Sequence, residues 1–420
     1  MLKIFKKVTL VLLIFSFIGA IFAGCSNKYI SKSGDRVEMW EKDIDYLAKE
    51  LPKRHKNLFF KLTEEEFNTE IDKLKESLEQ LNDDKIRLNI QKIVASAGDG
   101  HTTTNIGADK MFPMELYWFN DGFYVINTSP EYEKIMYSKL IEVNSQDINS
   151  VIEKLSKVIS HDNIAHLRSK MPIYIEISTI MCGLDIIDNP DYAKFTFENR
   201  NGQEIELEMK STGGEYVLDN ILGKGKVGEI PLYMKNSDKF YWYEYFEDDK
   251  MIYFKYNLCR QMKEKSFKKF SKELMEAINN KDVEKLVIDI RNNGGGSSPI
   301  LNNFIDELSN CKLNQKGKLY VIVGKKTFSS AILNAISLKQ KTEAIFIGEP
   351  TGGKPNHYGE VKSFKLPNNK VRVKYSTKYF TNYDEDIDSF IPDKIIELTI
   401  DDYINNNDPI LDYIRKQAQE

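Results

Sequence analysis

The sequence predicts an α/β fold with a parallel sheet in its carboxyl-terminal part, and two observations carry that prediction. First, three short apolar runs rich in β-branched residues follow one another, each bounded by charges or glycines, which is typical of buried parallel strands. They cover residues 286–290, 319–323 and 344–347. Second, segments of helical length, residues 298–308 and 329–339, separate these runs. The expected order is therefore β-α-β-α-β.

Glycines and hydroxyl residues crowd the ends of the three expected strands. The loops concerned are residues 292–298, 324–330 and 348–354. Ligands of open α/β sheets bind at the carboxyl ends of the strands, so we expect the three loops to face one site.

The composition is that of a globular protein with enough apolar residues for two or three domains. The chain has 420 residues, of which 41% are hydrophobic. Its 59 basic and 63 acidic residues nearly cancel, which leaves a formal net charge of −4. A protein that binds nucleic acid would need a basic face, so we expect no nucleic-acid partner.

The amino terminus has the pattern of a secretory signal. Three lysines within the first seven residues precede an apolar run over residues 8–23, and Cys25 follows. The ending Phe-Ala-Gly-Cys25 resembles the lipobox of bacterial lipoproteins, whose cysteine is lipidated after cleavage. The alternative is an uncleaved membrane anchor, for which the run is short. Either way we expect a body outside the cytoplasm that is tethered to the cell membrane, with residues 26–36 as the tether.

Three further cysteines, Cys182, Cys259 and Cys311, are widely spaced. They form no disulfide framework, and the chain has no CxxC or HExxH pattern. We expect buried apolar thiols, no metal site and no cofactor.

Patterns upstream of the sheet divide the chain into further units. Apolar residues at helical spacing over 37–97, with a capping box that begins at Thr63, predict a small helical unit. Alternating and aromatic segments from Met114 to Val143, followed by a turn and a helix, resemble the core of a PDZ domain. The expected parts are a signal peptide at 1–25, a tether at 26–36, the helical unit and its following loop at 37–110, a PDZ-like module at 111–165, a β-hairpin and linker at 166–239, and the α/β core at 240–420.

Ser329 is the best candidate for a nucleophile. It follows a predicted strand by a short loop and opens a helix, so its hydroxyl would lie at the positive end of that helix. The N–H of Ser330 would then point to where an oxyanion forms, and residues 294–296, all glycine, can bring more N–H groups close. The alternative is that Ser329 only caps the helix.

Two residues could serve as the base. His101 lies in a tight Asp-Gly-His turn, where an imidazole can accept a proton from a serine hydroxyl. Lys354 lies in a glycine-rich loop and could do the same if burial lowered its pKa. Each could equally be an ordinary loop or surface residue. One carboxylate of the acidic cluster at 384–388 could orient the histidine, although such clusters are usually solvated.

Three motifs together resemble the tail-specific, or carboxyl-terminal processing, family of serine peptidases. They are Asp-Ile-Arg-Asn-Asn-Gly-Gly-Gly at 289–296, Thr-Phe-Ser-Ser-Ala at 327–331 and Gly-Glu-Pro-Thr-Gly-Gly-Lys at 348–354. The resemblance implies a ClpP/crotonase-like α/β catalytic core with an inserted PDZ-like domain. It also implies that Ser329 is the nucleophile, that Lys354 is the base of a Ser–Lys pair supported by Thr351, and that Gly295 and Ser330 donate to the oxyanion.

The chain departs from the Ser–Lys branch of that family around the nucleophile. Ser-Ser-Ala-Ile at 329–332 replaces the usual Ser-Ala-Ser-Glu. The Asp-Gly-His101 turn instead resembles the tricorn-like branch, in which this histidine is the base and a late carboxylate orients it. Asp386 fits that carboxylate best, ahead of Asp388 and Glu385. Histidine as a residue type titrates near neutral pH, whereas a lysine must lose several pKa units, so His101 is favoured over Lys354.

The sequence therefore predicts a membrane-tethered, extracytoplasmic serine peptidase that acts on proteins or peptides without a cofactor. The alternative is a non-catalytic peptide-binding or sensing lipoprotein on the same fold. The distance between the His101 ring and the Ser329 hydroxyl separates the peptidase from this alternative. A large distance would exclude the mechanism in which His101 is the base.

Overall fold

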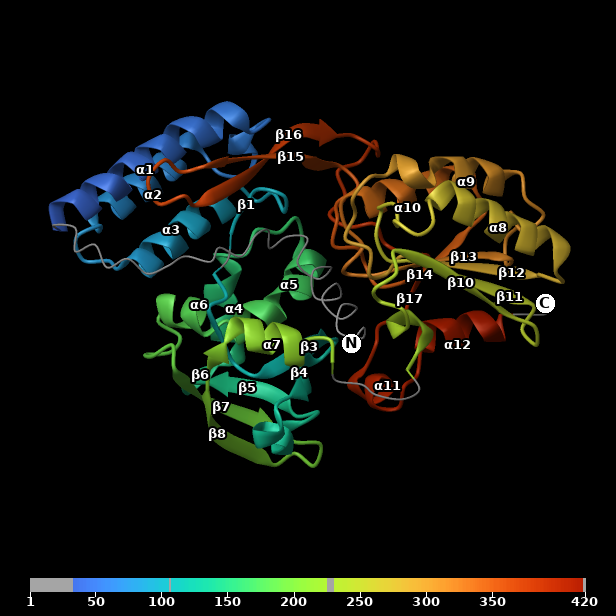
Figure 1. Ribbon diagram of the computed structural model, residues 1–420, viewed down its shortest axis with the longest axis horizontal. Coiled ribbons are helices and arrows are strands. Elements are labelled where there is room, and N and C mark those ends of the chain that lie inside the picture. The colour runs from blue at the N-terminus through green and yellow to red at the C-terminus, as the bar shows by residue number, and fades with distance from the viewer. Residues whose placement is uncertain (1–32, 106, 225–229, 418–420) are drawn as a thin grey trace, which may run out of the picture.

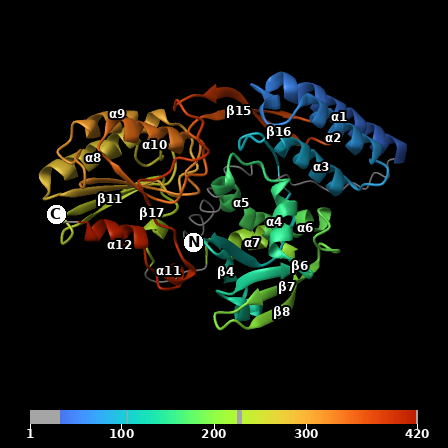
Figure 2. The ribbon, with the colours of Figure 1, turned by 180° about the vertical axis from the view of Figure 1, so that it is seen from behind.

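The computed structural model describes residues 33–417 apart from residues 106 and 225–229. The predicted signal peptide, most of the predicted tether and Cys25 lie outside the described residues. Within the described part of the chain, no helix combines the length and the apolar character needed to cross a membrane. Figures 1 and 2 show three parts: a helical unit, a sheet-based domain and an α/β core.

The α/β core confirms the predicted fold class. Its six-stranded sheet has the order β10-β11-β12-β13-β14-β17, in which β11 to β17 run parallel and β10 pairs antiparallel at one edge. The strands are β10 (Tyr241–Phe246), β11 (Met251–Tyr256), β12 (Lys285–Asp289), β13 (Leu319–Val323), β14 (Ile345–Gly348) and β17 (Lys394–Ile395).

Helices cover both faces of this sheet, as the two sets of buried side chains require. Leu286, Ile288 and Val321 pack toward three helices, whereas Val287 and Ile322 on the other face pack toward one. The helices are α8 (Phe267–Asn280), α9 (Pro299–Ser309) and α10 (Ser330–Lys341) on the first face and α12 (Pro409–Lys416) on the second. At the carboxyl end, α11 (Ile400–Ile404) ends before Pro409 opens α12.

The middle domain is built on an antiparallel sheet of order β3-β4-β5-β7-β8. The boundary predicted at residue 165 is not seen, because β7 of the predicted hairpin pairs with β5 and its Phe195 and Phe197 enter the same core as Phe123. The predicted linker also carries structure. The elements are β2 (Lys110–Met111), β3 (Met114–Phe119), β4 (Gly122–Thr128), η3 (Pro130–Ile135), β5 (Lys139–Val143), β6 (Gln146–Asp147), α4 (Ile148–Ser156), α5 (Ile164–Glu176), α6 (Ser178–Gly183), β7 (Tyr192–Glu198), β8 (Glu204–Lys210), β9 (Thr212–Gly213), α7 (Gly214–Asn220) and η4 (Leu232–Met234).

The helical unit forms as predicted, and its second helix begins with the expected capping box between Thr63 and Glu66. Its elements are α1 (Ser33–Arg54), η2 (Leu58–Phe60), α2 (Glu64–Glu76) and α3 (Asp83–Ala95). The turn at 98–102 leads from α3 into β1 (Thr103–Thr104).

A β-ribbon joins the helical unit to the α/β core. Its strands, β15 (His357–Lys365) and β16 (Arg372–Phe380), follow β14 in the chain. They leave the core and cross over the helices, as both views show (Figures 1 and 2). Leu366 and Val373 are buried with Trp40 and Ile90, and β1 pairs with β16. The predicted core at 240–420 includes these residues, but the ribbon packs on the amino-terminal helices.

Candidate active site

Ser329 lies in the turn between β13 and α10, and its backbone conformation is unusual. Its φ of 53° and ψ of −126° lie in a region that residues other than glycine rarely adopt. Neighbouring bonds hold the turn: the Phe328 N–H donates to the Asn293 carbonyl (3.0 Å), and the Thr327 hydroxyl donates to the Ile290 carbonyl (2.9 Å). Strained residues held in this way cluster at functional sites, because the surrounding structure must over-determine them.

The structure brings His101 to Ser329 across 228 residues of sequence. The His101 Nε2 and the Ser329 Oγ lie 2.9 Å apart, within hydrogen-bond distance. The imidazole is 3% exposed and stacks on the Phe328 ring at 4.5 Å between ring centres. With the ring proton on Nδ1, the Ser329 hydroxyl donates to Nε2, which is the arrangement of a nucleophile and its base.

Asp99 is the carboxylate nearest to the second ring nitrogen. Its Oδ1 lies 3.7 Å from His101 Nδ1 and accepts the backbone N–H of the same residue at 2.9 Å. Its Oδ2 accepts hydrogen bonds from the hydroxyls of Thr102 and Ser376 (2.6 Å each) and lies 3.1 Å from His55 Nε2. Burial alone would raise the pKa of this carboxyl group, but the two histidine rings and the Ser376 hydroxyl hold it well below its usual value. A fixed negative charge therefore faces the imidazole, where it stabilises the protonated ring.

The structure does not bring Asp386 to the histidine, which corrects the predicted third member of the site. The Asp386 carboxylate is 62% exposed and pairs with Lys354 at 3.3 Å. Asp388, the next choice, pairs with the same ammonium at 3.0 Å. Both carboxylates lie in a solvated loop and are engaged by Lys354.

Lys354 is placed as a cation and not as a base. Burial acts against its charge, but the hydrogen bonds and charges of Asp388 and Asp386 prevail, so its pKa is raised above the usual value. A lysine that activates a hydroxyl needs a lowered pKa. Thr351 donates to the carbonyl of Gly353 (2.9 Å) and so holds the loop that carries this lysine.

Gly295 and Ser330, the expected oxyanion donors, differ in what their N–H groups bind. Gly295 lies against Ser329, since a Cβ atom added to it would be 2.7 Å from the Ser329 Cβ. Its N–H, however, donates to the side chain of Asn293 at 2.9 Å. The N–H of Ser330, in the first turn of α10, has no hydrogen-bond acceptor among the described residues. Ser330 therefore offers an oxyanion donor in this state, and Gly295 would have to release Asn293 first.

Sequence reasoning missed four residues that build the site. Asn293 ties the glycine loop to both the Phe328 N–H and the Tyr256 carbonyl. His55 and Ser376 bind Asp99 from far away in the sequence, and Asp162 accepts the Gly100 N–H at 2.6 Å. Asn293 stands inside a glycine motif and could have been suspected. The other three have no local signal.

The charged residues of the first motif have a structural role. Asp289 is fully buried between Lys255 (3.1 Å) and Arg291 (2.9 Å). Arg291 also pairs through both terminal nitrogens with Asp408, at the start of α12. These pairs fix the end of β12 and with it the glycine loop.

Two cavities flank the carboxyl ends of the strands. The larger, about 520 Å³, lies between the ends of β12, β13 and β14, near Asn292, Val323 and Glu349, and the β3–β4 hairpin, near Tyr117. The smaller, about 230 Å³, lies beside Asp99 and His357. The three predicted loops thus do border open space at one edge of the sheet.

Within the described residues, no group of three or more His, Cys, Asp or Glu side chains is arranged to hold a metal ion. The three described cysteines are unpaired thiols, of which Cys259 is buried as expected, whereas Cys182 and Cys311 are half-buried.

Comparisons with known proteins agree with this architecture. Residues 251–312 match the profile of Peptidase family S41. The structure of mature CPAF complexed with lactacystin superposes with a TM-score of 0.62 at 13% sequence identity, covering 90% of this chain and 97% of that one. A CPAF mutant superposes with a TM-score of 0.65 at 13% identity over the same shares. No curated protein sequence matches the chain.

These matches show what the chain is similar to. The chain has a mixed α/β fold similar to that of S41-type peptidase structures. The similarity to Peptidase family S41 covers residues 251–312, and the similarity to the CPAF structures concerns the fold.

Proposed function

We propose that this protein is an extracytoplasmic serine peptidase in which Ser329 is the nucleophile and His101 is its general base. The 2.9 Å distance between His101 Nε2 and Ser329 Oγ carries the proposal. It joins a strained serine at a strand-to-helix turn with a buried imidazole, on a fold that is similar to peptidases.

The mechanism follows from these positions. His101 takes the hydroxyl proton while Ser329 Oγ attacks the carbonyl carbon of the scissile peptide bond. The Ser330 N–H stabilises the resulting oxyanion, and the positive end of α10 adds to that stabilisation. His101 then gives the proton to the leaving amine, and the charge of Asp99 stabilises the imidazolium between the two transfers. A water molecule hydrolyses the acyl-enzyme by the same steps.

A probe of serine nucleophiles tests this function. A fluorophosphonate should label the wild-type protein and should not label Ser329→Ala. Ser337→Ala, two turns along the same helix, is the matched control and should label like wild type. Equal labelling of wild type and Ser329→Ala would exclude Ser329 as nucleophile. No labelling, together with saturable binding of peptides, would favour the non-catalytic alternative.

We also propose that a lipid on Cys25 tethers the enzyme to the outer side of the cell membrane. The basic and apolar pattern before Cys25 supports this proposal. A lipid-anchored form should take up a labelled fatty acid in cells and partition into detergent. Cys25→Ala should lose both properties, and fatty-acid uptake that survives the substitution would contradict the anchor.

A further inference from the structure

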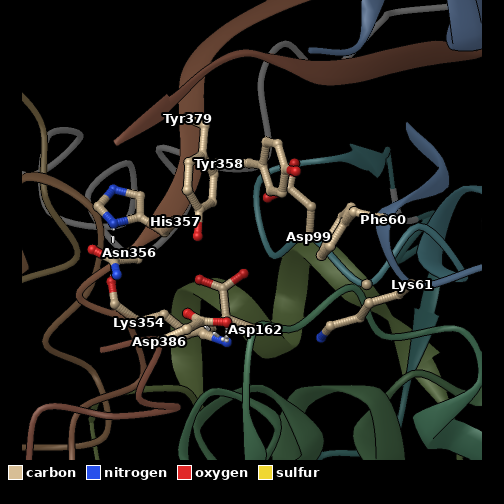
Figure 3. A pocket seen from close by; sticks show the side chains of 11 residues that line it. Phe60, Lys61, Asp99, Asp162, Lys354, Asn356, His357, Tyr358, Tyr379 and Asp386 are labelled. Carbon is tan, nitrogen blue, oxygen red and sulfur yellow. Dashed lines mark hydrogen bonds and ion pairs between the residues drawn. The ribbon is translucent and has the colours of Figure 1, made fainter. Parts of the chain in front are cut away.

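The smaller cavity is built from all three parts of the molecule and lies next to the catalytic histidine. Its wall includes Asp99, two residues before His101, and His357, whose ring stacks on the His101 ring at 5.9 Å between centres. The helical unit supplies Phe60, and the segment between α4 and α5 supplies Asp162 (Figure 3). None of these groups takes part in the mechanism above as a reacting group.

The cavity contains a buried carboxylate with an unused oxygen. Asp162 is 7% exposed, and its Oδ1 accepts the Gly100 N–H. Its Oδ2 is buried and has no hydrogen-bond partner among the described residues. Figure 3 shows this carboxylate in the middle of the lining side chains, directed into the cavity. Burial, and then the charge of Asp99, raise the pKa of Asp162, whereas the charges of His101 and of Lys170 act in the opposite direction.

Aromatic rings form one wall of the cavity. The Phe60 and Tyr358 rings lie 4.4 Å apart, and the Tyr358 and Tyr379 rings 4.7 Å apart. Aromatic faces attract cations, and a carboxylate beside them adds charge attraction. One cation already uses this wall, since the Lys61 ammonium lies 5.8 Å from the centre of the Phe60 ring.

Two of the residues that line the cavity are lysines, Lys354 and Lys61. Lys354 is matched by Asp386 and Asp388, two carboxylates for one ammonium. Lys61 is solvent-exposed and forms no ion pair among the described residues, so its flexible side chain can move aside. The chemistry that completes the cavity is an alkylammonium or guanidinium group, which would pair with Asp162 Oδ2.

The position of the cavity relates it to the leaving-group side of the substrate. His101 must pass its proton to the leaving amine, so the substrate chain that follows the scissile bond runs past this histidine. The cavity adjoins the histidine through Asp99 and His357. A side chain on this part of the substrate is therefore the one that can enter it.

We propose, on the basis of the function proposed above, that this cavity is a subsite for a lysine or arginine side chain of the substrate, recognised by Asp162 and the aromatic wall. The assignment explains why a carboxylate with a free oxygen is buried beside a histidine base. It predicts a preference for positive charge at one substrate position after the cleaved bond.

Mapping of cleavage sites tests the subsite. The full-length enzyme is given a mixture of denatured proteins, and the cleaved bonds are identified by mass spectrometry. Lysine and arginine should be enriched about five- to tenfold at one position on the leaving-group side. Asp162→Asn keeps an oxygen for the Gly100 N–H and should lose the enrichment, which is measured as the ratio of charged to neutral cleavage sites within the same sample. No enrichment in wild type, or equal enrichment in Asp162→Asn, would overturn the proposal.

Two further variants separate recognition from damage to the fold. Lys61→Met removes the competing ammonium and should raise the enrichment, a gain that loss of structure cannot produce. Tyr358→Leu removes the middle ring and should lower it, which keeps the proposal testable if Asp162→Asn does not fold. Asp306→Asn is the charge-matched control, because it removes an exposed carboxylate on α9 that pairs with Lys341. This variant should leave the enrichment unchanged.

Two further measurements test whether the cavity binds a substrate side chain or a free amine, and whether a negative result concerns the subsite alone or the proposed function. Free n-butylamine should inhibit cleavage of sites with lysine and spare neutral sites; an equal effect on both would make the cavity an effector site and overturn the proposal. Fluorophosphonate labelling is measured in every sample. Labelling without a charge preference would overturn the subsite alone, whereas absence of labelling would overturn the proposed function and the subsite with it.

Discussion

The two side chains of the proposed mechanism, Ser329 and His101, are positioned in different ways. Ser329 depends on a short piece of local chain, the end of β13 and the start of α10, held by the neighbouring glycine loop. His101 depends on contacts that come from distant segments, because Asp99 is bound by His55 and Ser376 and the turn is held by Asp162. The position of the proposed nucleophile is thus set by the α/β core, whereas the position of the proposed base depends on the helical unit, the ribbon and the middle domain being assembled on that core.

This difference has a consequence for stability and activity. The core sheet is covered on both faces and should keep its own fold when the other parts loosen. The base is held by a few buried hydrogen bonds, each of which leaves an unsatisfied group when its partner is lost. Activity should therefore be lost before the core unfolds.

The largest effect among the supporting residues is expected at Asp99. Asp99→Asn removes the charge that faces His101. It also places an amide, which has only one acceptor oxygen, beside the Thr102 and Ser376 hydroxyls that donate to the carboxylate. We expect a fall in kcat of about 10²- to 10⁴-fold and a loss of about 3–5 kcal/mol in the free energy of unfolding. Kinetics and chemical denaturation measure these two quantities.

The pH dependence of that stability difference has a definite sign. The folded pKa of Asp99 is depressed, so its stabilisation is present above the unfolded pKa, about 4, and is lost as the pH falls through the folded value. The gap between wild type and Asp99→Asn should shrink as the pH falls below about 4. A gap that widens in acid would contradict this assignment of the charge.

A smaller effect on activity is expected on the nucleophile side, at Gly295. Its φ of 103° disfavours any side chain, and an added Cβ would lie 2.7 Å from the Ser329 Cβ. Gly295→Ala should lower kcat about 10²- to 10³-fold by displacing the nucleophile and the oxyanion donors. Gly317→Ala is the matched control, since Gly317 also has a positive φ (83°) but open space around it. Similar losses in both variants would mean that backbone strain, and not the site, causes the effect.

The packing of the ribbon on the helices should have the smallest direct effect on chemistry. Leu366 is fully buried there, and Leu366→Ala should cost about 2–5 kcal/mol through a cavity. Hydrogen exchange should rise in α2, α3 and the 98–102 turn but not in β12 and β13, with hydrolysis falling in parallel. Leu308→Ala, equally buried on α9, should instead raise exchange in the core. If each variant raised exchange equally in the helical unit and in the α/β core, the claim that the two parts loosen separately would be contradicted.

The sequence predicted the parts that rest on local patterns. The three central strands and their helices, the capping box at Thr63 and the position of Ser329 all follow from apolar periodicity and from glycine and hydroxyl placement. The resemblance carried by the Asp-Gly-His turn pointed to His101, and the structure places its ring beside the serine hydroxyl.

The parts that the sequence missed depend on contacts between distant segments. The cluster at 384–388 looked suitable as the orienting carboxylate, but its ion pairs with Lys354 are formed only in the folded chain. The hairpin at 192–210 was separated from its sheet because strand pairing with β5 leaves no trace in either segment. His55, Asp162 and Ser376 carry no motif. They matter because three units meet at one turn.

The measurement that tests the account most directly compares His101→Ala with Lys354→Met on an unfolded protein substrate. His101→Ala should lower the rate of hydrolysis about 10³- to 10⁴-fold, because it removes the base that lies 2.9 Å from Ser329 Oγ. Lys354→Met should lower it less than about tenfold, because its ammonium is paired with exposed carboxylates. Hydrolysis that survives in His101→Ala and disappears in Lys354→Met would contradict the account.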